Sequence, residues 1–203
     1  MNSFPLVYQP SPLAVWLSLS GLLFLLVGLA HLIPFFTKRD MRTFQSIHAR
    51  LQPYTNTFRY IWPLGTTPVA LVLLAMTFIP GTRTGFLTTL VYFSLAATER
   101  MLKMKIKRSR PFEKHQATVM SQPSRPHDPS HPSGDAMRVW FLALVLPAIF
   151  GLSWPVTFVT GCLAVLLCFG RLGLGVHYPL DVIGGTGLGL LGAGITMLLW
   201  IKP

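Results

Sequence analysis

Long apolar stretches alternate with short charged segments along the whole chain. Several stretches reach the roughly 18–20 residues that a helix needs to cross the hydrocarbon core of a bilayer. They predict six transmembrane helices, at about Leu13–Phe36, Tyr60–Ile79, Gly85–Arg108, Ala136–Leu152, Val156–Gly170 and Val182–Ile201. The pattern therefore predicts an all-α integral membrane protein, with one bundle formed by a single domain over residues 1–203.

The segments between these stretches carry the helix breaks and much of the charge. Residues 37–57 are predicted to form a basic polar link, and residues 153–155 a short turn. Residues 112–134 contain a proline at every third position over much of their length, which predicts an irregular loop. Glu99 and Lys103 are four residues apart and should face each other on the third helix.

The last apolar stretch is rich in glycine. Gly185, Gly189 and Ala193 recur every four residues, a spacing that predicts close packing against other helices in lipid. A nucleotide-binding glycine loop would need a preceding strand, and the sequence indicates none.

Composition favours a protein of the bilayer. Hydrophobic residues make up 51% of the 203 residues and charged residues 11%, against about 25% charged residues in a typical soluble domain. The net charge is +11, from 17 Lys and Arg against 6 Asp and Glu. Because the basic residues lie between apolar stretches, they indicate membrane topology and an anionic substrate, and not a nucleic acid partner. No feature indicates an oligomeric state.

Neither a cleaved signal peptide nor a disulfide is indicated. The first basic residue is Lys38, so the positively charged start of a signal peptide is missing and the first helix is expected to remain. Cys162 and Cys168 lie in one apolar stretch and are interpreted as small core residues.

Polar residues gather on one side of the predicted bundle. In a six-helix chain the end of the third helix, the start of the fourth and the junction of the fifth and sixth share one membrane face. That face carries Lys103, Arg110, Ser133, Gly134, Asp135, Arg171, His177 and Asp181. Charges at membrane depth are costly and usually mark a functional site.

These residue types suit a phosphate group. The three cations can each donate charge-assisted hydrogen bonds to its oxygens. Ser133 can add a hydroxyl donor, and the Gly134 amide a backbone donor at a helix N-terminus. His177 is the best available nucleophile, and a nearby carboxylate would fix its orientation. The simpler alternative is a buried polar network in which Arg171, His177 and Asp181 only join two helices.

No metal or cofactor is predicted. The 6 acidic residues are scattered along the chain, so no carboxylate cluster would hold Mg²⁺. The His and Asp residues of the 112–134 loop do not follow a zinc-ligand spacing.

Three short motifs agree in order and spacing with those of a known family. The family pattern is KxxxxxxRP, then PSGH, then SRxxxxxHxxxD. The corresponding residues are Lys103 with Arg110-Pro111, then Pro132-Ser133-Gly134-Asp135, then Arg171, His177 and Asp181. Over about residues 85–190 the chain thus resembles the type 2 phosphatidic acid phosphatase superfamily of membrane lipid phosphatases.

The resemblance implies a covalent mechanism. His177 would attack phosphorus and form a phosphohistidine that water then hydrolyses, while Asp181 orients His177. Transition-state stabilisation of the phosphoryl oxygens would come from Lys103, Arg110, Ser133, Gly134 and Arg171. In the family, the His of PSGH protonates the leaving alcohol.

The sequence departs from the family pattern at two positions. Gly170 replaces a Ser, a minor change, and Asp135 replaces the His of PSGH. Asp135 can act as a general acid only if burial raises its pKa, and the nearby cations act in the opposite direction. A leaving phosphate needs less protonation than an alkoxide, so Asp135 favours a diphosphate lipid. His131 is a candidate substitute acid, and an ordinary loop histidine is the simpler interpretation.

We therefore predict a metal-independent, membrane-embedded lipid phosphatase or diphosphatase. Its substrate is expected to be an isoprenyl diphosphate, phosphatidic acid or phosphatidylglycerophosphate. Two alternatives stay open: a lipid phosphotransferase that uses the same intermediate, and a catalytically silent lipid-binding protein.

The distribution of basic residues predicts the orientation in a bacterial inner membrane. Most of them lie on the side of the site, whereas Arg83 and Lys202 lie on the other. The positive-inside rule then predicts a site that faces the cytoplasm and two termini outside. Many bacterial relatives are thought to act on the outer face, so the resemblance and the charge distribution disagree.

Overall fold

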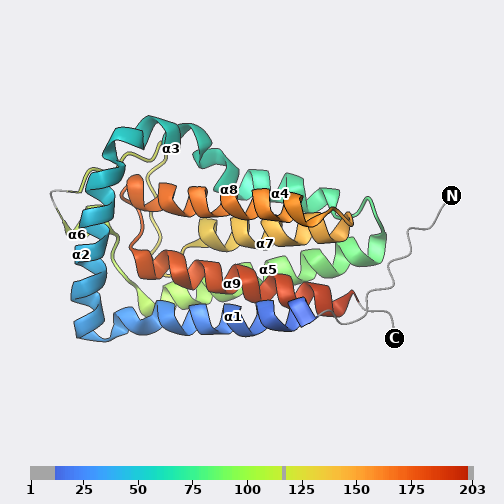
Figure 1. Cartoon of the computed structure of the whole chain (residues 1–203). Helices are drawn as coiled ribbons and strands as arrows, with labels where there is room; N and C mark the ends of the chain where they lie inside the picture. The colour runs from blue at the N-terminus through green and yellow to red at the C-terminus, as the bar shows by residue number, and fades with distance from the viewer. Residues whose placement is uncertain (1–11, 116–117, 201–203) are drawn as a thin grey trace.

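The computed structural model describes residues 12–115 and 118–200, and the chain is helical over these ranges, with no strand among them. The helices are α1 (Pro12–Gly28), α2 (Pro34–Leu51), α3 (Thr55–Ile61), α4 (Thr67–Met76), α5 (Thr82–Ile106), α6 (Pro111–Lys114), α7 (Gly134–Ile149), α8 (Trp154–Gly173) and α9 (Pro179–Leu199). Short 3₁₀ turns are η1 (Leu29–Leu32), η2 (Gln52–Tyr54) and η3 (Trp62–Gly65). The longer helices lie side by side, and α2 runs across one end of the bundle (Figure 1). The predicted all-α fold is confirmed for the described residues.

Helix α9 is central and packs against α1, α5 and α7. Its glycines let neighbouring backbones approach closely. A Cβ atom added at Gly185 would lie 2.2 Å from the Ser133 carbonyl oxygen, and one at Gly189 would lie 2.6 Å from that of Met137. A Cβ atom at Gly187 would overlap the α1 backbone in the same way. The close packing predicted for the small-residue stripe is therefore confirmed.

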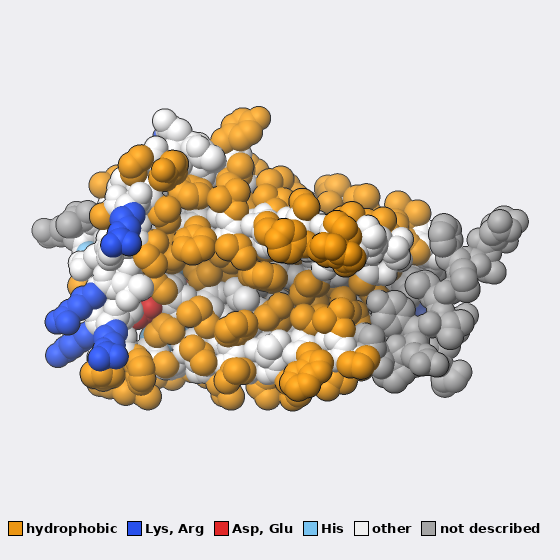
Figure 2. Space-filling view, in the orientation of Figure 1, with side chains coloured by type: hydrophobic (Ala, Val, Ile, Leu, Met, Phe, Trp, Pro, Cys, Tyr) orange, Lys and Arg blue, Asp and Glu red, His pale blue; other side chains and the backbone are white. Residues whose placement is uncertain are grey.

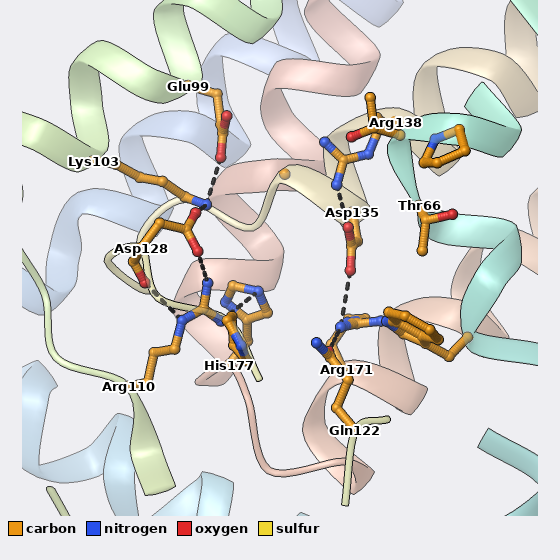
Figure 3. A pocket seen from close by; sticks show the side chains of 15 residues that line it. Thr66, Glu99, Lys103, Arg110, Gln122, Asp128, Asp135, Arg138, Arg171 and His177 are labelled. Atoms are coloured by element: carbon orange, nitrogen blue, oxygen red, sulfur yellow. Dashed lines mark hydrogen bonds and ion pairs between the residues drawn. The ribbon is translucent and has the colours of Figure 1, made fainter. Parts of the chain in front are cut away.

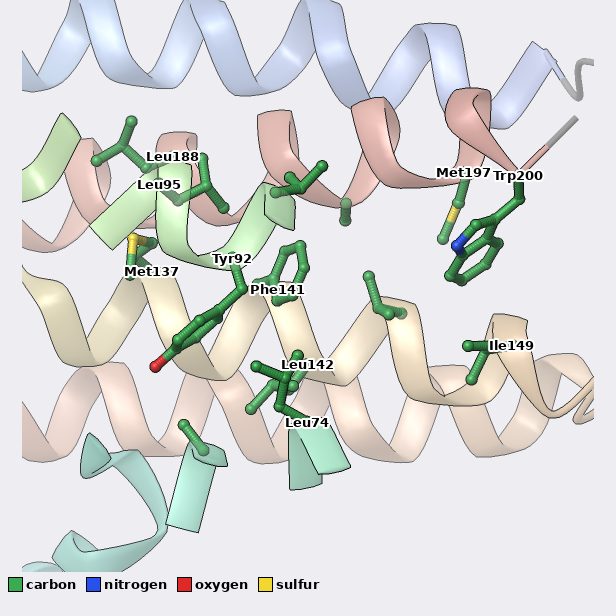
Figure 4. Close-up of a cluster of buried hydrophobic side chains, with 14 of the residues drawn as sticks. Leu74, Tyr92, Leu95, Met137, Phe141, Leu142, Ile149, Leu188, Met197 and Trp200 are labelled. Carbon is green, nitrogen blue, oxygen red and sulfur yellow. The ribbon is translucent and has the colours of Figure 1, made fainter. Parts of the chain in front are cut away.

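Buried apolar side chains fill the space between α5, α7 and α9 (Figure 4). The rings of Tyr92 and Phe141 lie 5.9 Å apart between centroids. Trp200, just after α9, donates its indole N–H to Thr88 Oγ1 at 3.2 Å. In lipid, helices are held together by van der Waals packing and such interhelical hydrogen bonds. This core fixes the helices whose ends carry the predicted site residues.

Within residues 12–115 and 118–200, three segments are long and apolar enough to cross a membrane: Pro12–Leu32, Trp154–Gly173 and Pro179–Leu199. A fourth results if Pro34–Gly65 and Thr67–Met76, which meet at a bend of 48°, count as one crossing. The predicted number of six is not confirmed. Helix α7 has 16 residues, and a helix of that length covers about 24 Å, less than the roughly 30 Å hydrocarbon core. Helix α5 is longer but carries Lys residues in its last turn.

The surface is apolar along the bundle and basic at one end. Figure 2 shows mostly hydrophobic side chains over the length of the bundle, with Lys and Arg gathered at the end where α2 lies. Exposed large side chains include Trp16, Trp154 and Phe158. An apolar surface of this extent fits contact with lipid.

The segment predicted as a polar link, residues 37–57, is largely helical. Pro34 begins α2 and ends the first apolar helix earlier than predicted, because proline suits a first helical turn and cannot continue the preceding helix. Asp40, Phe44 and His48 follow at intervals of four and form the buried face of α2. The prediction was wrong because two of these three buried residues are polar, so the face lacks an apolar stripe.

Other predicted boundaries shift at prolines. The second predicted helix, residues 60–79, is divided among α3, η3 and α4, with Pro63 and Pro68 in the first turns of η3 and α4. The turn predicted at residues 153–155 is instead the start of α8. The 112–134 loop is irregular over its described residues apart from α6 and the first residue of α7.

Two further predictions concern single residues. Both cysteines are free thiols, and Cys168 is buried as predicted, whereas Cys162 is exposed and the core prediction is wrong for it. Two other predictions lie outside the described residues, as do both termini. These are the end of the last helix at Ile201 and the basic residue Lys202 on the side opposite the site.

Candidate active site

A polar pocket of about 370 Å³ opens at one end of the bundle (Figure 3). The pocket lies between η3, the ends of α5 and α8, the starts of α4 and α7, and the loop before α7. It is lined by Trp62, Thr66, Thr67, Pro68, Glu99, Lys103, Arg110, Gln122, Pro126, Asp128, Gly134, Asp135, Arg138, Arg171 and His177. Segments far apart in the sequence thus contribute charged side chains to one cavity.

Asp128 forms the first group of ion pairs in the pocket. Its carboxylate contacts Lys103 Nζ and lies 2.8 Å from Arg110 Nη2, while its carbonyl oxygen accepts from Arg110 Nε at 2.8 Å. Glu99 pairs with Lys103 at 2.6 Å, which confirms the predicted contact on α5. Burial opposes ionisation of Asp128, but the charges of Lys103 and Arg110 outweigh it and hold the pKa of this carboxyl well below its usual value.

Asp135 forms a second group on the other side of the pocket. It lies in the first turn of α7, 2.9 Å from Arg171 Nη2, and also contacts the guanidinium of Arg138. Arg138 donates from Nε to the Gly65 carbonyl oxygen at 3.0 Å, and Arg171 also contacts the side-chain oxygen of Gln122. Two guanidiniums against one carboxylate stabilise its ionised form. Asp135 therefore lies in the pocket as an anion.

His177 lies in the segment between α8 and α9, and its ring lines the pocket. Nε2 is 3.3 Å from Arg110 Nη1, and Nδ1 is 3.3 Å from Ser130 Oγ and 3.8 Å from Asp181 Oδ2. Ser130 Oγ donates to Asp181 Oδ2 at 2.5 Å. Because a guanidinium has only donors, Nε2 must accept and the ring proton belongs on Nδ1.

The surroundings of His177 keep its imidazole neutral. Burial, and then the charge of Arg110, lower the pKa of His177 from 6.5 to about 4. The contact with Asp181 acts in the opposite direction and is weaker. At neutral pH the ring thus presents an unprotonated Nε2 to a cationic cavity, which is the form that a nucleophile requires.

The pocket includes six of the eight residues predicted as the site. Lys103, Arg110, Gly134, Asp135, Arg171 and His177 line it, whereas Ser133 and Asp181 are fully buried outside its lining. Ser133 is the N-cap of α7, where its hydroxyl accepts from the Ala136 amide at 3.4 Å.

Sequence reasoning missed several residues that line the pocket. Arg138 could have been found, since it follows Asp135 by three positions on one helix face. Gln122 and Asp128 belong to an aperiodic loop, and no spacing rule links such positions to Arg171 or Lys103.

Two histidines lie beside the site without lining it. His131 is fully buried, with Nδ1 3.3 Å from Asp181 Oδ1, and its ring centroid is 4.3 Å from that of His31. His131 thus contacts the carboxylate of Asp181 and does not line the pocket.

The departure at Gly170 has a packing reason. A Cβ atom at this position would lie 3.1 Å from Cδ1 of Phe58, which α3 packs over the end of α8. A serine at Gly170 would require that ring to shift.

Among the described residues, no group of three or more His, Cys, Asp or Glu side chains is arranged to hold a metal ion.

Comparisons with known proteins agree with this fold and pocket. Residues 69–202 match the PAP2 superfamily. The chain is 34% identical over 124 residues to phosphatidylglycerophosphatase B of Bacillus subtilis, covering 57% of this chain and 58% of that protein. It is 33% identical over 141 residues to an undecaprenyl-diphosphatase of Sulfolobus acidocaldarius, covering 68% and 62%. The matches thus span about three fifths of the length of these relatives.

Two crystal structures are similar over most of their length. One is a transmembrane PAP2-type phosphatidylglycerolphosphate phosphatase from Bacillus subtilis, with a TM-score of 0.72 and 25% identity over 90% of this chain and 93% of that one. The other is Aquifex aeolicus LpxE, with a TM-score of 0.64 and 27% identity over 77% and 93%. The fold is that of a membrane phosphatase. The chain belongs to the PAP2 superfamily, as its three motifs predicted, and its apolar helices make it an integral membrane protein.

Proposed function

We propose that this protein hydrolyses phosphorylated lipids through a covalent intermediate on His177. The observation that carries the proposal is the position of His177 Nε2, 3.3 Å from Arg110 Nη1 in a pocket also lined by Lys103 and Arg171. An imidazole nucleophile beside fixed cations suits phosphoryl transfer, because catalysis there is mostly positioning and stabilisation of oxygen charge.

The reaction proceeds in two displacements. Nε2 of His177 attacks phosphorus, the N–P bond forms, and the bond to the lipid oxygen or to the leaving phosphate breaks. The ring then carries a positive charge with its proton on Nδ1. This N–H donates to Ser130 Oγ, and the Ser130 hydroxyl in turn donates to Asp181 Oδ2. Water next attacks phosphorus, the N–P bond breaks, and inorganic phosphate leaves with His177 neutral again.

The cations stabilise the transferred group by changing partners. Lys103 and Arg110 now hold the Asp128 carboxylate, and Arg171 holds Asp135. A bound phosphate offers the same kind of acceptor, so its oxygens take over these charge-assisted hydrogen bonds. Gly134 adds the N-terminus of α7 to this side of the pocket, and Ser133 supports it as N-cap.

Asp135 favours a diphosphate lipid, such as an isoprenyl diphosphate, over phosphatidic acid or phosphatidylglycerophosphate. Its two guanidinium partners keep it ionised, so it is a poor proton donor. A departing phosphate needs little protonation, whereas a departing alkoxide needs much. Asp135 can instead accept a proton from the water that opens the phosphohistidine.

A panel of lipid phosphates tests the function directly. The purified protein should release phosphate from the panel with a chelator present, and His177→Ala should abolish release. Absence of release from every lipid would favour a silent lipid-binding protein. Transfer of phosphate to an added lipid or sugar acceptor, in place of water, would favour a phosphotransferase.

The membrane arrangement is part of the proposal. In this arrangement α1, α5, α7, α8 and α9 each cross the bilayer, and α3 and α4 together form a sixth crossing, whereas α2 lies across the end of the bundle. The basic end of the bundle, where α2 lies, faces the cytoplasm according to the positive-inside rule. The pocket then opens on the cytoplasmic side.

A further inference from the structure

Asp40 on α2 is a buried carboxylate with no part in the mechanism described so far. It is 5% exposed and lies outside residues 69–202, the range that matches the family. A buried carboxylate is costly unless it is paired and hydrogen-bonded. The partners of Asp40 therefore indicate what it does.

Both oxygens of Asp40 contact elements that hold the nucleophile. Oδ2 accepts from Arg108 Nη2 at 2.5 Å, and Oδ1 accepts from the Leu180 amide at 3.0 Å. Leu180 follows His177 by three residues, in the first turn of α9. Asp40 thus connects α2 to the segment that carries the nucleophile.

Arg108 continues the connection towards Asp181. Its Nη1 donates to Asp181 Oδ1 at 2.6 Å, and its guanidinium lies 4.2 Å from the centroid of the Tyr178 ring. The Arg108 carbonyl oxygen accepts from the Ser130 amide at 2.8 Å. The Arg108 guanidinium therefore bridges two carboxylates, and the Arg108 backbone supports Ser130, which contacts His177.

Asp181 completes the connection to His177. Its Oδ2 accepts from Ser130 Oγ at 2.5 Å and from the Tyr178 amide at 2.9 Å. Ser130 in turn lies 3.3 Å from His177 Nδ1. Because Asp181 and His177 are 3.8 Å apart, the orientation of the imidazole depends on where Ser130 and Asp181 are held.

We propose that Asp40 is a positioning residue for His177, acting through Arg108, Asp181 and Ser130. This inference rests on the proposed function, because it concerns the same nucleophile. Without Asp40, Arg108 loses one of its two carboxylates and the first turn of α9 loses an acceptor. Asp181 then has more freedom, and the imidazole is no longer held with Nε2 towards the pocket.

The role predicts a specific kinetic pattern. Asp40→Asn keeps the size of the side chain and an acceptor for Leu180 but removes the charge that holds Arg108. We expect kcat to fall about 10-fold, since small misplacements of reacting groups cost up to about 100-fold. The KM for a lipid diphosphate and the inhibition constant for inorganic phosphate should change less than about twofold, because Lys103, Arg110 and Arg171 are untouched.

A double-mutant cycle tests whether Asp40 acts through the connection described. Ser130→Ala should lower kcat on its own, and Asp40→Asn combined with Ser130→Ala should be no slower than the slower single variant. Arg42→Gln, an exposed change on the same helix, is the matched control and should leave kcat unchanged. Thermal unfolding and gel filtration in detergent show whether each variant is folded.

The outcomes separate the inference from the proposed function. If wild-type activity depends on His177 but folded Asp40→Asn keeps the wild-type kcat, the positioning role is refuted and the proposed function stands. Multiplicative effects of the two changes, or a loss confined to KM, would also overturn the role. Activity that survives His177→Ala would instead refute the proposed function.

Discussion

The guanidinium of Arg110 lies 3.3 Å from Nε2 of His177, and the same guanidinium is bound by the side chain and backbone of Asp128. One cation therefore fixes the tautomer of His177, the proposed nucleophile, and also belongs to an ion pair that a bound phosphate would replace in the proposed reaction. This relationship connects the charge state of His177 with the proposed phosphate binding.

The charge state of His177 predicts how the protein responds to acid. Its pKa is lowered to about 4, so the imidazole should stay neutral down to about pH 5. NMR titration of ¹³C-labelled histidines, with His177→Gln to assign the signal, should give a midpoint near 4. A midpoint near 6.5, the ordinary value, would contradict the described environment.

The same shift has a consequence for stability. Between about pH 4 and 6.5 the unfolded chain binds a proton at His177 that the folded chain does not bind. The contribution of His177 to the free energy of unfolding therefore falls as pH drops through this window. Wild type should lose more thermal stability than His177→Gln between pH 7 and pH 4. Equal losses would indicate that His177 titrates normally in the fold.

Asp135 should determine the preference between diphosphate and monoester. Asp135→His restores the proton donor of the family motif, and a general acid contributes roughly 10²- to 10⁴-fold to such steps. We expect the ratio of kcat/KM for a polyprenyl diphosphate to that for phosphatidic acid to fall at least about 10-fold. Asp135→Asn, which supplies no acid, is the control and should not improve the monoester. A wild-type preference for the monoester would contradict the role given to Asp135.

Asp128 should compete with phosphate for Lys103 and Arg110, because it pairs with both cations. Asp128→Asn removes the competing charge and keeps the backbone carbonyl that holds Arg110 Nε. Inorganic phosphate should then inhibit about 10-fold more strongly, equivalent to about 1.4 kcal/mol. His127→Asn, an exposed neighbour, should leave inhibition unchanged. Weaker inhibition by phosphate in Asp128→Asn would mean that the carboxylate supports the phosphate site.

The orientation in the membrane can be tested at the loop before α7. Ser124 is exposed, so Ser124→Cys, in a protein with both native cysteines changed to Ala, provides a labelling site. A membrane-impermeant maleimide should label it only after intact cells are permeabilised. Labelling in intact cells would put the pocket on the outer face.

The sequence predicted what depends on local spacing. Arg171 and His177 lie close in sequence, at the junction between α8 and α9. Lys103 and Arg110 likewise lie on either side of the end of α5. Each pair reaches the same pocket because few residues separate its members. The helical class followed from apolar run lengths alone. These features need no knowledge of how distant segments pair.

The rest of the site and of the fold depends on contacts between distant segments, which no periodic spacing in the sequence indicates. Asp128 and Gln122 reach the cations from an irregular loop, where nothing in the spacing indicates a partner. Asp40 is buried against partners from distant segments, Arg108 and the Leu180 amide, so α2 was not recognised as a packed helix. The breaks at Pro63 and Pro68 do carry a local signal, because proline suits a first helical turn, and they were missed because residues 60–79 were predicted as one apolar helix.

The most direct test of the account is to look for the covalent intermediate on His177. The protein should be mixed with a ³²P-labelled lipid diphosphate, quenched within milliseconds and assayed for protein-bound label that is stable to alkali and labile to acid. We predict such label in wild type, located on a peptide that contains His177 and absent from His177→Ala. Full turnover of the labelled lipid by His177→Ala, or label on another residue, would contradict the account.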